Sequence, residues 1–144
     1  KLETEKLVKT LSNKWLIIRP SAVYGNNGNQ ILNKLIESLN KQNEIIINNF
    51  NEKLDFTEVN EFCDNLIKLI LLDVNNDIYN FSRNNARTLK EVVDILFQYY
   101  PNLKYQHLEK QISPKRGNLS NKKLFENTGI TFDVDIEKGI KKLL

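Results

Sequence analysis

The chain has one cysteine, Cys63, and one histidine, His107, so nucleophilic and metal chemistry have few candidates. A lone cysteine excludes a disulfide framework, and together with a lone histidine it leaves too few ligands for a Cys/His zinc site. Cys63 stands among Phe62 and Leu66 on a predicted helix face, which favours a small core side chain over a nucleophile. His107 has no acidic or nucleophilic partner at an informative spacing and is interpreted as structural. The sequence therefore predicts no metal site.

Charge and hydropathy argue against two classes of partner. The 21 basic and 18 acidic residues are spread along the 144-residue chain and leave a net charge of +3, a surplus too small to favour binding to a phosphate backbone. The longest apolar stretch, Leu66 to Leu72, is interrupted by Lys68 and is far shorter than the ~20 residues that span a bilayer. We expect no nucleic-acid partner, no membrane span and, from cysteine usage, a reducing cytoplasmic setting.

The elements that must position any functional side chain are helices alternating with strands. We expect helices over residues 1–13, 31–39, 58–72, 88–100, 121–129 and 135–144, and strands over residues 15–19, 44–49, 78–81 and 104–108. Residues 20–29 are predicted to be a loop, and residues 51–57 a turn-rich segment. Thr88 and Glu91 form a predicted capping box, and Asp135 a predicted helix cap. This alternation argues for an α/β domain whose principal strands are parallel.

The number of buried strands is low for such a domain. Only the strands at 15–19 and 78–81 read as fully buried parallel-sheet strands, and two strands make a poor sheet without neighbours. The chain also contains no methionine, although a natural chain normally begins with one. We therefore expect the sequence to be the later part of a larger fold.

Two segments near the N-terminus carry the most informative pattern. Lys1 to Glu5 is followed, one strand later, by Arg19-Pro-Ser-Ala-Val-Tyr-Gly25. Together they resemble the extended short-chain dehydrogenase/reductase family, in particular its NAD-dependent nucleotide-sugar epimerase and dehydratase branch. The resemblance implies that Lys1 is the lysine of a Tyr-x-x-x-Lys motif whose tyrosine would stand before the first residue. In that family the lysine lowers the pKa of the tyrosine and hydrogen-bonds the nicotinamide ribose, so Lys1 is expected to be catalytic and cofactor-binding.

The loop after the first strand is expected to contact the cofactor, which the resemblance implies to be NAD or NADP. The loop follows the carboxyl end of a predicted parallel strand, where open α/β sheets bind ligands. The family walls the nicotinamide with this loop, which implies cofactor contacts from Pro20, Ser21 and Val23. Many epimerases and dehydratases have an asparagine at the position of Ala22, and alanine cannot make its amide contact with a sugar nucleotide.

A first substrate-binding landmark lies at residues 53–59. The sequence Lys-Leu-Asp-Phe-Thr-Glu-Val resembles the Arg-Asp-Phe/Trp-x-x-Val segment of the family, whose arginine pairs with the nucleotide diphosphate. Leu54 replaces that arginine, and Lys53 beside it supplies a charge without the guanidinium fork. Asp55 is interpreted either as a residue that fixes the loop or as a helix-start residue.

A second landmark is the basic loop at residues 114–117, Pro-Lys-Arg-Gly. It resembles the second phosphate-binding loop of the family, which implies Lys115 and Arg116 as phosphate ligands. A solvated basic loop is the alternative interpretation. Gln30 takes a place where relatives often have an asparagine near the diphosphate, so it is also expected to bind substrate.

The predicted fold class is α/β, as the C-terminal part of a Rossmann-like fold with a small mixed α/β substrate-binding lobe. Residues 1–25 are expected to form the last helix and strand region of the dinucleotide-binding domain. Residues 26–144 are expected to form mainly the substrate-binding lobe, with residues 58–81 returning a helix and a strand to the Rossmann sheet.

The resemblance implies the C-terminal, substrate-binding part of an NAD(P)-dependent nucleotide-sugar epimerase or dehydratase that acts by hydride transfer at a sugar carbon. A nucleotide-sugar 4-keto reductase of the same family stays open, because the Tyr-Gly loop and residues 119–124 also suggest it. A non-catalytic interaction subunit stays open because of Leu54 and Ala22. The full-length protein is expected to be a homodimer. The 144 residues alone are expected to be inactive, since they hold neither the tyrosine nor a Gly-rich pyrophosphate turn.

Overall fold

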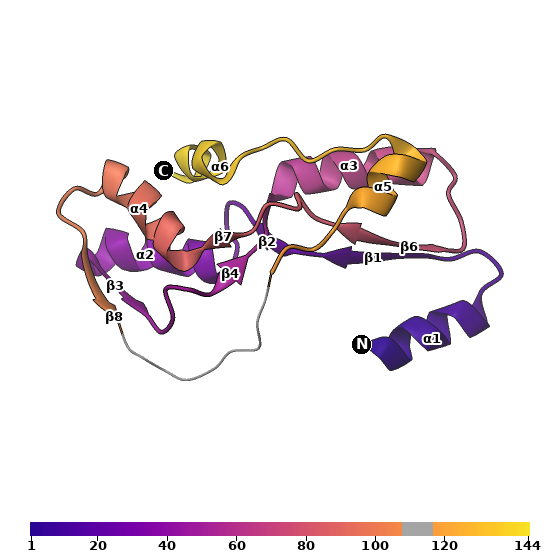
Figure 1. Cartoon of the computed structure of the whole chain (residues 1–144), viewed down its shortest axis with the longest axis horizontal. Coiled ribbons are helices and arrows are strands. Elements are labelled where there is room, and N and C mark those ends of the chain that lie inside the picture. Colours follow the sequence, from indigo (N-terminus) through magenta and orange to yellow (C-terminus); the bar gives the residue numbers. More distant parts are fainter. Residues whose placement is uncertain (108–116) are drawn as a thin grey trace.

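The computed structural model describes residues 1–107 and 117–144 as helices alternating with short strands (Figure 1). The helices are α1 (Leu2–Leu11), α2 (Ile31–Gln42), α3 (Val59–Leu71), α4 (Leu89–Tyr99), α5 (Lys122–Thr128) and α6 (Ile136–Leu143). The strands are β1 (Leu16–Pro20), β2 (Ala22–Tyr24), β3 (Glu44–Ile47), β4 (Lys53–Leu54), β5 (Phe56–Glu58), β6 (Asp77–Phe81), β7 (Arg87–Thr88) and β8 (Lys104–His107). Every predicted helix and strand has a counterpart whose ends differ from the prediction by at most three residues, and Leu108, the last residue of the predicted strand 104–108, lies outside the described residues. No helix of the described ranges is long and apolar enough to cross a membrane.

The strands pair two by two. β1 pairs with β6, β2 with β5 and β3 with β8, all in parallel, whereas β4 and β7 are antiparallel. In the first pair, Leu16 lies opposite Asp77 and Pro20 opposite Phe81. The predicted α/β class with parallel principal strands is therefore confirmed. The expectation that β1 is fully buried is wrong, because none of its residues is buried and β6 is its only strand neighbour in the described residues.

Three short strands lie where the sequence predicts loop or turn. β2 falls within residues 20–29, and β4 and β5 fall within or at the end of residues 51–57. Each has two or three residues, which is too few to show an alternating pattern. β2 and β5 pair with Val23 opposite Thr57, so the chain after β1 runs directly into a second parallel pair.

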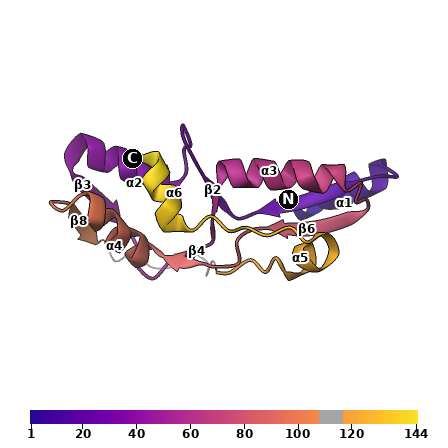
Figure 2. The same cartoon turned by 90° about the horizontal axis from the view of Figure 1, so that it is seen from above.

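Two hydrophobic cores hold the elements together. One includes Leu32 of α2, Val92 of α4 and Ile140 of α6. The other includes Leu69 of α3 and Leu124 of α5, packed with the aromatic side chains of β6. In both views α2, β3, β8 and α4 gather at one end of the molecule, and α3, β1, β6 and α5 at the other (Figures 1 and 2). The predicted division of the chain into a dinucleotide-binding part (residues 1–25) and a substrate-binding lobe (mainly residues 26–144) stays a prediction.

Local signals begin and end helices as the sequence predicts. Thr88 caps α4 in a capping box, in which the backbone N–H of Glu91 donates to Thr88 Oγ1 at 3.1 Å and the N–H of Thr88 donates to Glu91 Oε2 at 2.7 Å. Asp135 caps α6 and accepts from the N–H of Glu137 at 3.0 Å. Gly129 follows α5 with a φ of 70°, a left-handed conformation that glycine adopts without steric cost.

Helix α1 is attached to β1 by polar contacts and lies on the side of β1 opposite to α3 (Figure 1). No residue of α1 is buried. Arg19 donates to both carboxylate oxygens of Glu5, at 2.9 and 2.6 Å. The ammonium of Lys9 lies 5.1 Å from the centre of the Trp15 ring. The helix therefore turns its charged side toward the rest of the molecule.

The buried side of α3 differs from the prediction. Cys63, expected to be a core side chain, is exposed, and the apolar side chain of Ile70 is 61% exposed. Asn65 and Leu69 are the buried residues of the helix. Asn65 tolerates burial because its Nδ2 donates to the carbonyl of Thr131 at 2.6 Å. A hydrogen bond across 66 positions leaves no signal in a local apolar pattern.

A close approach of α6 to β2 depends on a glycine. Tyr24 of β2 is 2% exposed, and a Cβ atom on Gly139 of α6 would lie 1.7 Å from the Tyr24 hydroxyl oxygen. That distance is far inside van der Waals contact. A glycine at residue 139 is therefore needed to pack α6 against β2.

Candidate functional site

A cavity of about 610 Å³ lies where β1 ends. Its lining side chains come from the start of α1, the β1–β2 junction, the start of α2, the β4–β5 junction and the segment after residue 116. They are Lys1, Pro20, Ser21, Ala22, Gln30, Leu54, Asp55, Gly117, Asn118 and Leu119. The carboxyl end of a parallel strand is the position where α/β sheets bind ligands. This cavity is therefore the candidate functional site.

The cavity brings together four side chains that the sequence predicts to be functional. Lys1, Pro20, Ser21 and Gln30 all line it, although they come from three separate elements. The carbonyl of Lys1 accepts from the N–H of Glu5 at 3.0 Å, and Lys1 is the N-cap residue of helix α1. Their shared location agrees with the roles that the family resemblance implies, and those roles stay predictions.

Ser21 is fixed on three sides. Its backbone N–H donates to the carbonyl of Phe81 in β6 at 3.1 Å, and its own carbonyl accepts from Val23 at 3.0 Å. Its hydroxyl oxygen lies 2.7 Å from the hydroxyl oxygen of Thr57. Thr57 is 1% exposed and supports the site from behind Ser21. It falls in the predicted turn-rich segment 51–57, so no sequence signal marks this contact.

Asp55 fixes the loop, and it is not a helix-start residue. It is 4% exposed, and Glu58 is the residue that caps α3. Asp55 Oδ2 accepts from the N–H of Leu119 at 3.3 Å. Burial raises the pKa of this carboxyl above its usual value, and the backbone N–H groups of Leu119 and residues 83–85 oppose that shift. Of the two interpretations left open by the sequence, the structure supports the first.

The wall beyond Asp55 is formed by the segment that follows residue 116. The side chain of Asn118 accepts from the N–H of Ala86, and Leu119 is held by Asp55. The carbonyl of Leu119 also accepts from the hydroxyl of Ser82. The cavity therefore closes between two loops that are tied to each other by hydrogen bonds.

Four predicted site residues lie away from this cavity or beyond the described structure. Val23 lies on β2 opposite Thr57 and is not among the lining side chains. Lys53 is exposed on β4 and is not among them either. Lys115 and Arg116 fall outside the described residues. Their predicted contacts stay predictions.

Two residues that depart from the family pattern line the cavity directly. Ala22 and Leu54 both contribute to its wall, and Leu54 is 4% exposed. The backbone N–H of Ala22 donates to the carbonyl of Asp55 at 2.8 Å, which holds the β1–β2 junction against the β4–β5 junction. The wall is therefore apolar where the family places an amide and a guanidinium.

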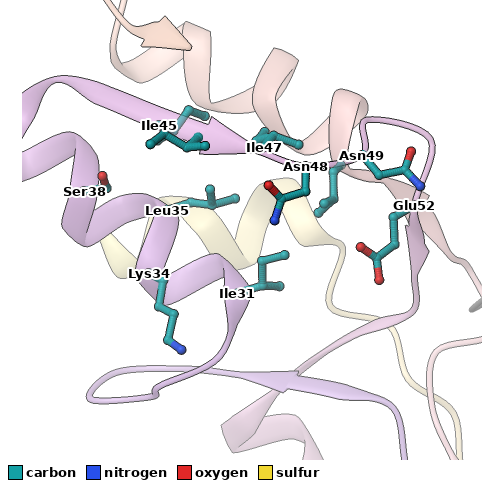
Figure 3. Close-up of a pocket in the computed structure, with 11 residues that line it drawn as sticks. Ile31, Lys34, Leu35, Ser38, Ile45, Ile47, Asn48, Asn49 and Glu52 are labelled. Atoms are coloured by element: carbon teal, nitrogen blue, oxygen red, sulfur yellow. The ribbon is translucent and has the colours of Figure 1, made fainter. Parts of the chain in front are cut away.

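A second cavity of about 300 Å³ lies between α2, β3 and the loop that follows β3 (Figure 3). Ile31 and Leu35 of α2 face Ile45 and Ile47 of β3 across it (Figure 3). Polar groups line its mouth, and they are Lys34, Ser38, Asn48, Asn49 and Glu52. Its apolar residues lie within a predicted helix and a predicted strand, where apolar side chains are ordinary, so no sequence signal marks this cavity.

The linings of the two cavities include residues that are neighbours in the sequence at the start of α2. Gln30 lines the first and Ile31 the second. Leu54 lines the first and Glu52 the second, so both cavities also meet the segment that leads into β4.

The described part of the chain offers no cluster of metal ligands. No group of three or more His, Cys, Asp or Glu side chains that would hold a metal occurs within residues 1–107 and 117–144. The His107 ring rests against Phe50, with 4.7 Å between ring centres.

Comparison with protein-family models gives no match for this chain, and comparison with curated proteins gives none either. Solved structures do match. TunA, a NAD-dependent NDP-hexosamine 5,6-dehydratase of tunicamycin biosynthesis, matches at a TM-score of 0.86 and 19% identity, over 99% of this chain and 49% of that one. The ADP-L-glycero-D-manno-heptose-6-epimerase of Helicobacter pylori matches at 0.83 and 18%, over 99% and 48%.

A third solved structure, RMD from Pseudomonas aeruginosa in complex with NADPH, matches at a TM-score of 0.84 and 16% identity, over 100% of this chain and 53% of that one. The chain thus spans about half the length of each of these structures. TM-scores of 0.83 to 0.86 show a shared fold, and identities below one fifth limit the conclusion to the fold. The shared fold agrees with the parallel strand pairs and with the cavity at the end of β1. The chain therefore shares the Rossmann-like α/β fold of these solved structures over about half of their length.

Proposed function

We propose that this chain is the substrate-binding part of an NAD(P)-dependent nucleotide-sugar epimerase or dehydratase, a cytoplasmic homodimer in its full-length form. The observation that carries the proposal is the cavity at the end of β1, which gathers Lys1, Pro20, Ser21 and Gln30. The fold supports it, because the matched solved structures include enzymes of this kind.

The side chains around the first cavity suit a nicotinamide cofactor and the sugar beside it. Pro20 and Leu54 offer apolar surface to a planar ring, while Lys1, Ser21 and Gln30 offer hydrogen bonds to hydroxyl and amide groups. A volume of about 610 Å³ lies within the range of small-molecule sites. The bound cofactor would supply the hydride acceptor.

Each residue would have a separate task in that chemistry. Lys1 would donate to the ribose and stabilise a phenolate beside it, since a positive charge lowers the pKa of a nearby phenol. Ser21, held by Thr57 at 2.7 Å, would orient the nicotinamide. Gln30 would hold the diphosphate side of the substrate, together with Lys53, Lys115 and Arg116. Val23 would support the cofactor loop from β2.

The second cavity would take the base of the nucleotide. A base is planar and apolar on its faces but carries hydrogen-bonding groups on its edge. The apolar floor of Ile31, Ile45 and Ile47 with Asn48 and Asn49 at the mouth (Figure 3) offers both kinds of contact. The sugar would then lie in the first cavity and the diphosphate over the start of α2.

One observation favours a second candidate function, a non-catalytic interaction subunit. Ala22 and Leu54 replace polar ligand-binding residues of the family, and both line the cavity. A protein that has kept the fold but lost the catalytic activity would be expected to lose such polar contacts with the ligand. A 4-keto reductase is the alternative within the enzyme class, and it would use the same cavity.

Titration of the chain with UDP-glucose and with NADH, followed by amide NMR shifts, tests the proposal. UDP-glucose should shift the amides of Ser21, Ala22 and Asn118 and those around Ile31 and Asn48. Gln30→Ala should weaken binding about tenfold, as expected for one hydrogen bond to a charged group. Gln42→Ala, an exposed glutamine at the other end of α2, is the matched control and should leave binding unchanged.

Absence of saturable shifts at these amides with either ligand would overturn the enzyme proposal and favour the interaction subunit. Shifts confined to residues remote from both cavities would overturn the assignment of the site. Ala22→Asn separates the two functions further: restored amide contact should tighten UDP-glucose binding in an enzyme, whereas an interaction subunit should gain nothing from it.

A further inference from the structure

A third cavity, of about 280 Å³, lies between the β2–α2 loop, α2 and the end of α6. Residues 33, 36, 37 and 40 of α2 line it, whereas residues 31, 34, 35 and 38 line the second cavity. Because an α-helix has about 3.6 residues per turn, the two sets lie on different sides of α2. No described residue lines both the third cavity and either of the two cavities described above.

Amide side chains supply most of the polar groups of the third cavity. They are Asn26, Asn27, Asn33 and Asn40, and each amide both donates and accepts hydrogen bonds. The Tyr100 hydroxyl donates to Asn40 Oδ1 at 2.7 Å, which holds this amide in place and leaves its Nδ2 available to donate. Ile36 and Leu143 add apolar surface to the same lining. The cavity therefore offers amide donors and acceptors beside an apolar wall.

The charged groups of this lining cancel each other. Glu37 and Lys41 form an ion pair at 2.5 Å, and the described residues contribute no other charged side chain to the lining. An anionic ligand would have to compete with Glu37 for Lys41, and a cationic ligand would have to compete with Lys41 for Glu37. The third cavity therefore favours an uncharged ligand.

Asn33 leaves a hydrogen-bond acceptor unpaired at this cavity. Its Nδ2 donates to the carbonyl of Gly25 at 2.7 Å, whereas its Oδ1 is buried without a hydrogen-bond partner in the described residues. Gly28 lies directly against this oxygen, since a Cβ atom on residue 28 would lie 2.7 Å from it. An unpaired buried acceptor costs free energy. A hydroxyl group that enters between Gly28 and Asn33 would remove this cost.

We propose that the third cavity binds a free, uncharged monosaccharide. The hydroxyl groups of a sugar donate and accept as the amides of the lining do, and its C–H groups pack on apolar side chains such as Ile36 and Leu143. A volume of about 280 Å³ is at the lower end for small-molecule sites, which suits one sugar ring better than a whole nucleotide sugar. Because its lining is separate from the first two cavities, this site does not depend on the proposed function.

Titration of the 144 residues with D-glucose, D-galactose and D-mannose, followed by amide NMR shifts, tests the proposal. At least one hexose should give saturable shifts at the amides of Asn27, Gly28 and Asn40, with a dissociation constant of about 1–10 mM, as expected for a ligand of this size. Glucose 6-phosphate should bind no more tightly than glucose. UDP-glucose should leave these three amides unshifted.

Three results would overturn the proposal. One is the absence of saturable shifts at Asn27, Gly28 and Asn40 with all three hexoses up to about 100 mM, tenfold above the expected range. Another is tighter binding of glucose 6-phosphate than of glucose, because the ligand would then be an anion. The third is a shift of the same amides by UDP-glucose, because the ligand would then be a nucleotide sugar and not a free one.

The variant Asn27→Gly tests the amide contact without changing the backbone. Asn27 has a φ of 61°, which glycine adopts without steric cost, so the variant should remain folded. It should weaken hexose binding about fivefold, the effect of one lost hydrogen bond. Asn26→Ala, at an exposed residue, should also weaken binding.

The matched control is Asn84→Gly. Asn84 is also exposed and left-handed, with a φ of 60°, but it lies between β6 and β7 and does not line the third cavity. Asn84→Gly should bind the hexose as the parent does. Unchanged hexose binding in both Asn27→Gly and Asn26→Ala would place the sugar elsewhere and overturn the proposal.

Discussion

The hydroxyl oxygens of Ser21 and Thr57 lie 2.7 Å apart, and this pair joins the floor of the cavity to the interior of the molecule. Ser21 lines the cavity, whereas Thr57 is 1% exposed behind it. Because the two residues are on paired segments after β1 and in β5, the orientation of the Ser21 hydroxyl depends on a residue that no ligand touches.

Replacement of Thr57 by valine should measure that dependence. Valine keeps the shape and removes the hydroxyl, so the free energy of unfolding should fall by about 1 kcal/mol, the usual contribution of a buried hydrogen bond. Urea denaturation of Thr57→Val, Ser21→Ala and the double variant gives the coupling between the hydroxyls, which should be about 0.5–1.5 kcal/mol. Additive losses would show that the hydroxyls do not interact. Thr57→Ser should retain most of the coupling.

Substitution of Gly139 by alanine should destabilise the chain strongly. The added Cβ would lie 1.7 Å from the Tyr24 hydroxyl oxygen, so α6 must shift away from β2, at a cost of about 1–3 kcal/mol. Thermal unfolding followed by circular dichroism measures the loss. Ala substitution of the exposed Lys138 on the same helix is the control and should have little effect.

In the Gly139→Ala background, Tyr24→Phe should restore part of the lost stability, because it removes the hydroxyl oxygen nearest to the added Cβ. The Tyr24 hydroxyl is buried without a hydrogen-bond partner in the described residues, and burial raises the pKa of this phenol, so the hydroxyl stabilises nothing that phenylalanine would lose. We expect the single variant to be as stable as the parent or up to about 1 kcal/mol more stable. A clear destabilisation by Tyr24→Phe would contradict this account of the packing.

Asp135 should make the stability of the chain dependent on pH in the acid range. Burial opposes its ionisation, but the N–H of Glu137 and the charges of Arg83 and Arg87 outweigh burial and hold the pKa of Asp135 below its ordinary value of 3.8. Its carboxylate therefore stabilises the fold above pH 3.8, and this contribution is lost as the pH falls through the lower, folded-state pKa.

Asp135→Asn isolates the charge, because asparagine is also a good helix cap. At pH 7 the variant should be about 1 kcal/mol less stable than the parent. The difference should vanish near the acid limit, as followed by urea denaturation at a series of pH values. A difference that stays constant down to that limit would mean that the charge of Asp135 contributes nothing.

Removal of the charge on Glu5 should loosen α1 without unfolding the rest. The Glu5–Arg19 pair at 2.6 Å and the Lys9–Trp15 contact attach a helix that has no buried residue. In Glu5→Gln, the amides of α1 should exchange faster while the amides of α2 and α4 keep their rates. The exposed Glu3→Gln on the same helix turn is the control. Equal exchange rates in both variants would show that other contacts hold α1.

Features that depend on neighbouring residues in the sequence were predictable. The Thr88–Glu91 capping box, the cap at Asp135 and the end of α5 at Gly129 all follow from short-range hydrogen bonds or from the conformational freedom of glycine. The two strands of the parallel β1–β6 pair were also predictable, since both are apolar and a helix leads directly into the second.

Features set by contacts between distant residues were not predictable. Apolar spacing on α3 shows that a side is apolar, but it does not show whether anything covers that side, and Ile70 is exposed. Thr57 belongs to the site only because β5 pairs with β2. The second cavity is lined by residues that an apolar pattern assigns to an ordinary core.

Asp55 gives the cavity a place in the order of folding. Its bond to Leu119 joins residues 64 positions apart, and the bond of Glu61 to Val134 joins residues 73 positions apart. Closing such long loops costs more chain entropy than closing a helix turn, so contacts of this kind form late. During synthesis, Leu119 and Val134 must leave the ribosome before their bonds to Asp55 and Glu61 exist. The cavity is therefore among the last parts of the molecule to be assembled, and a chain shortened before Leu119 would lack α5, α6 and the closed site.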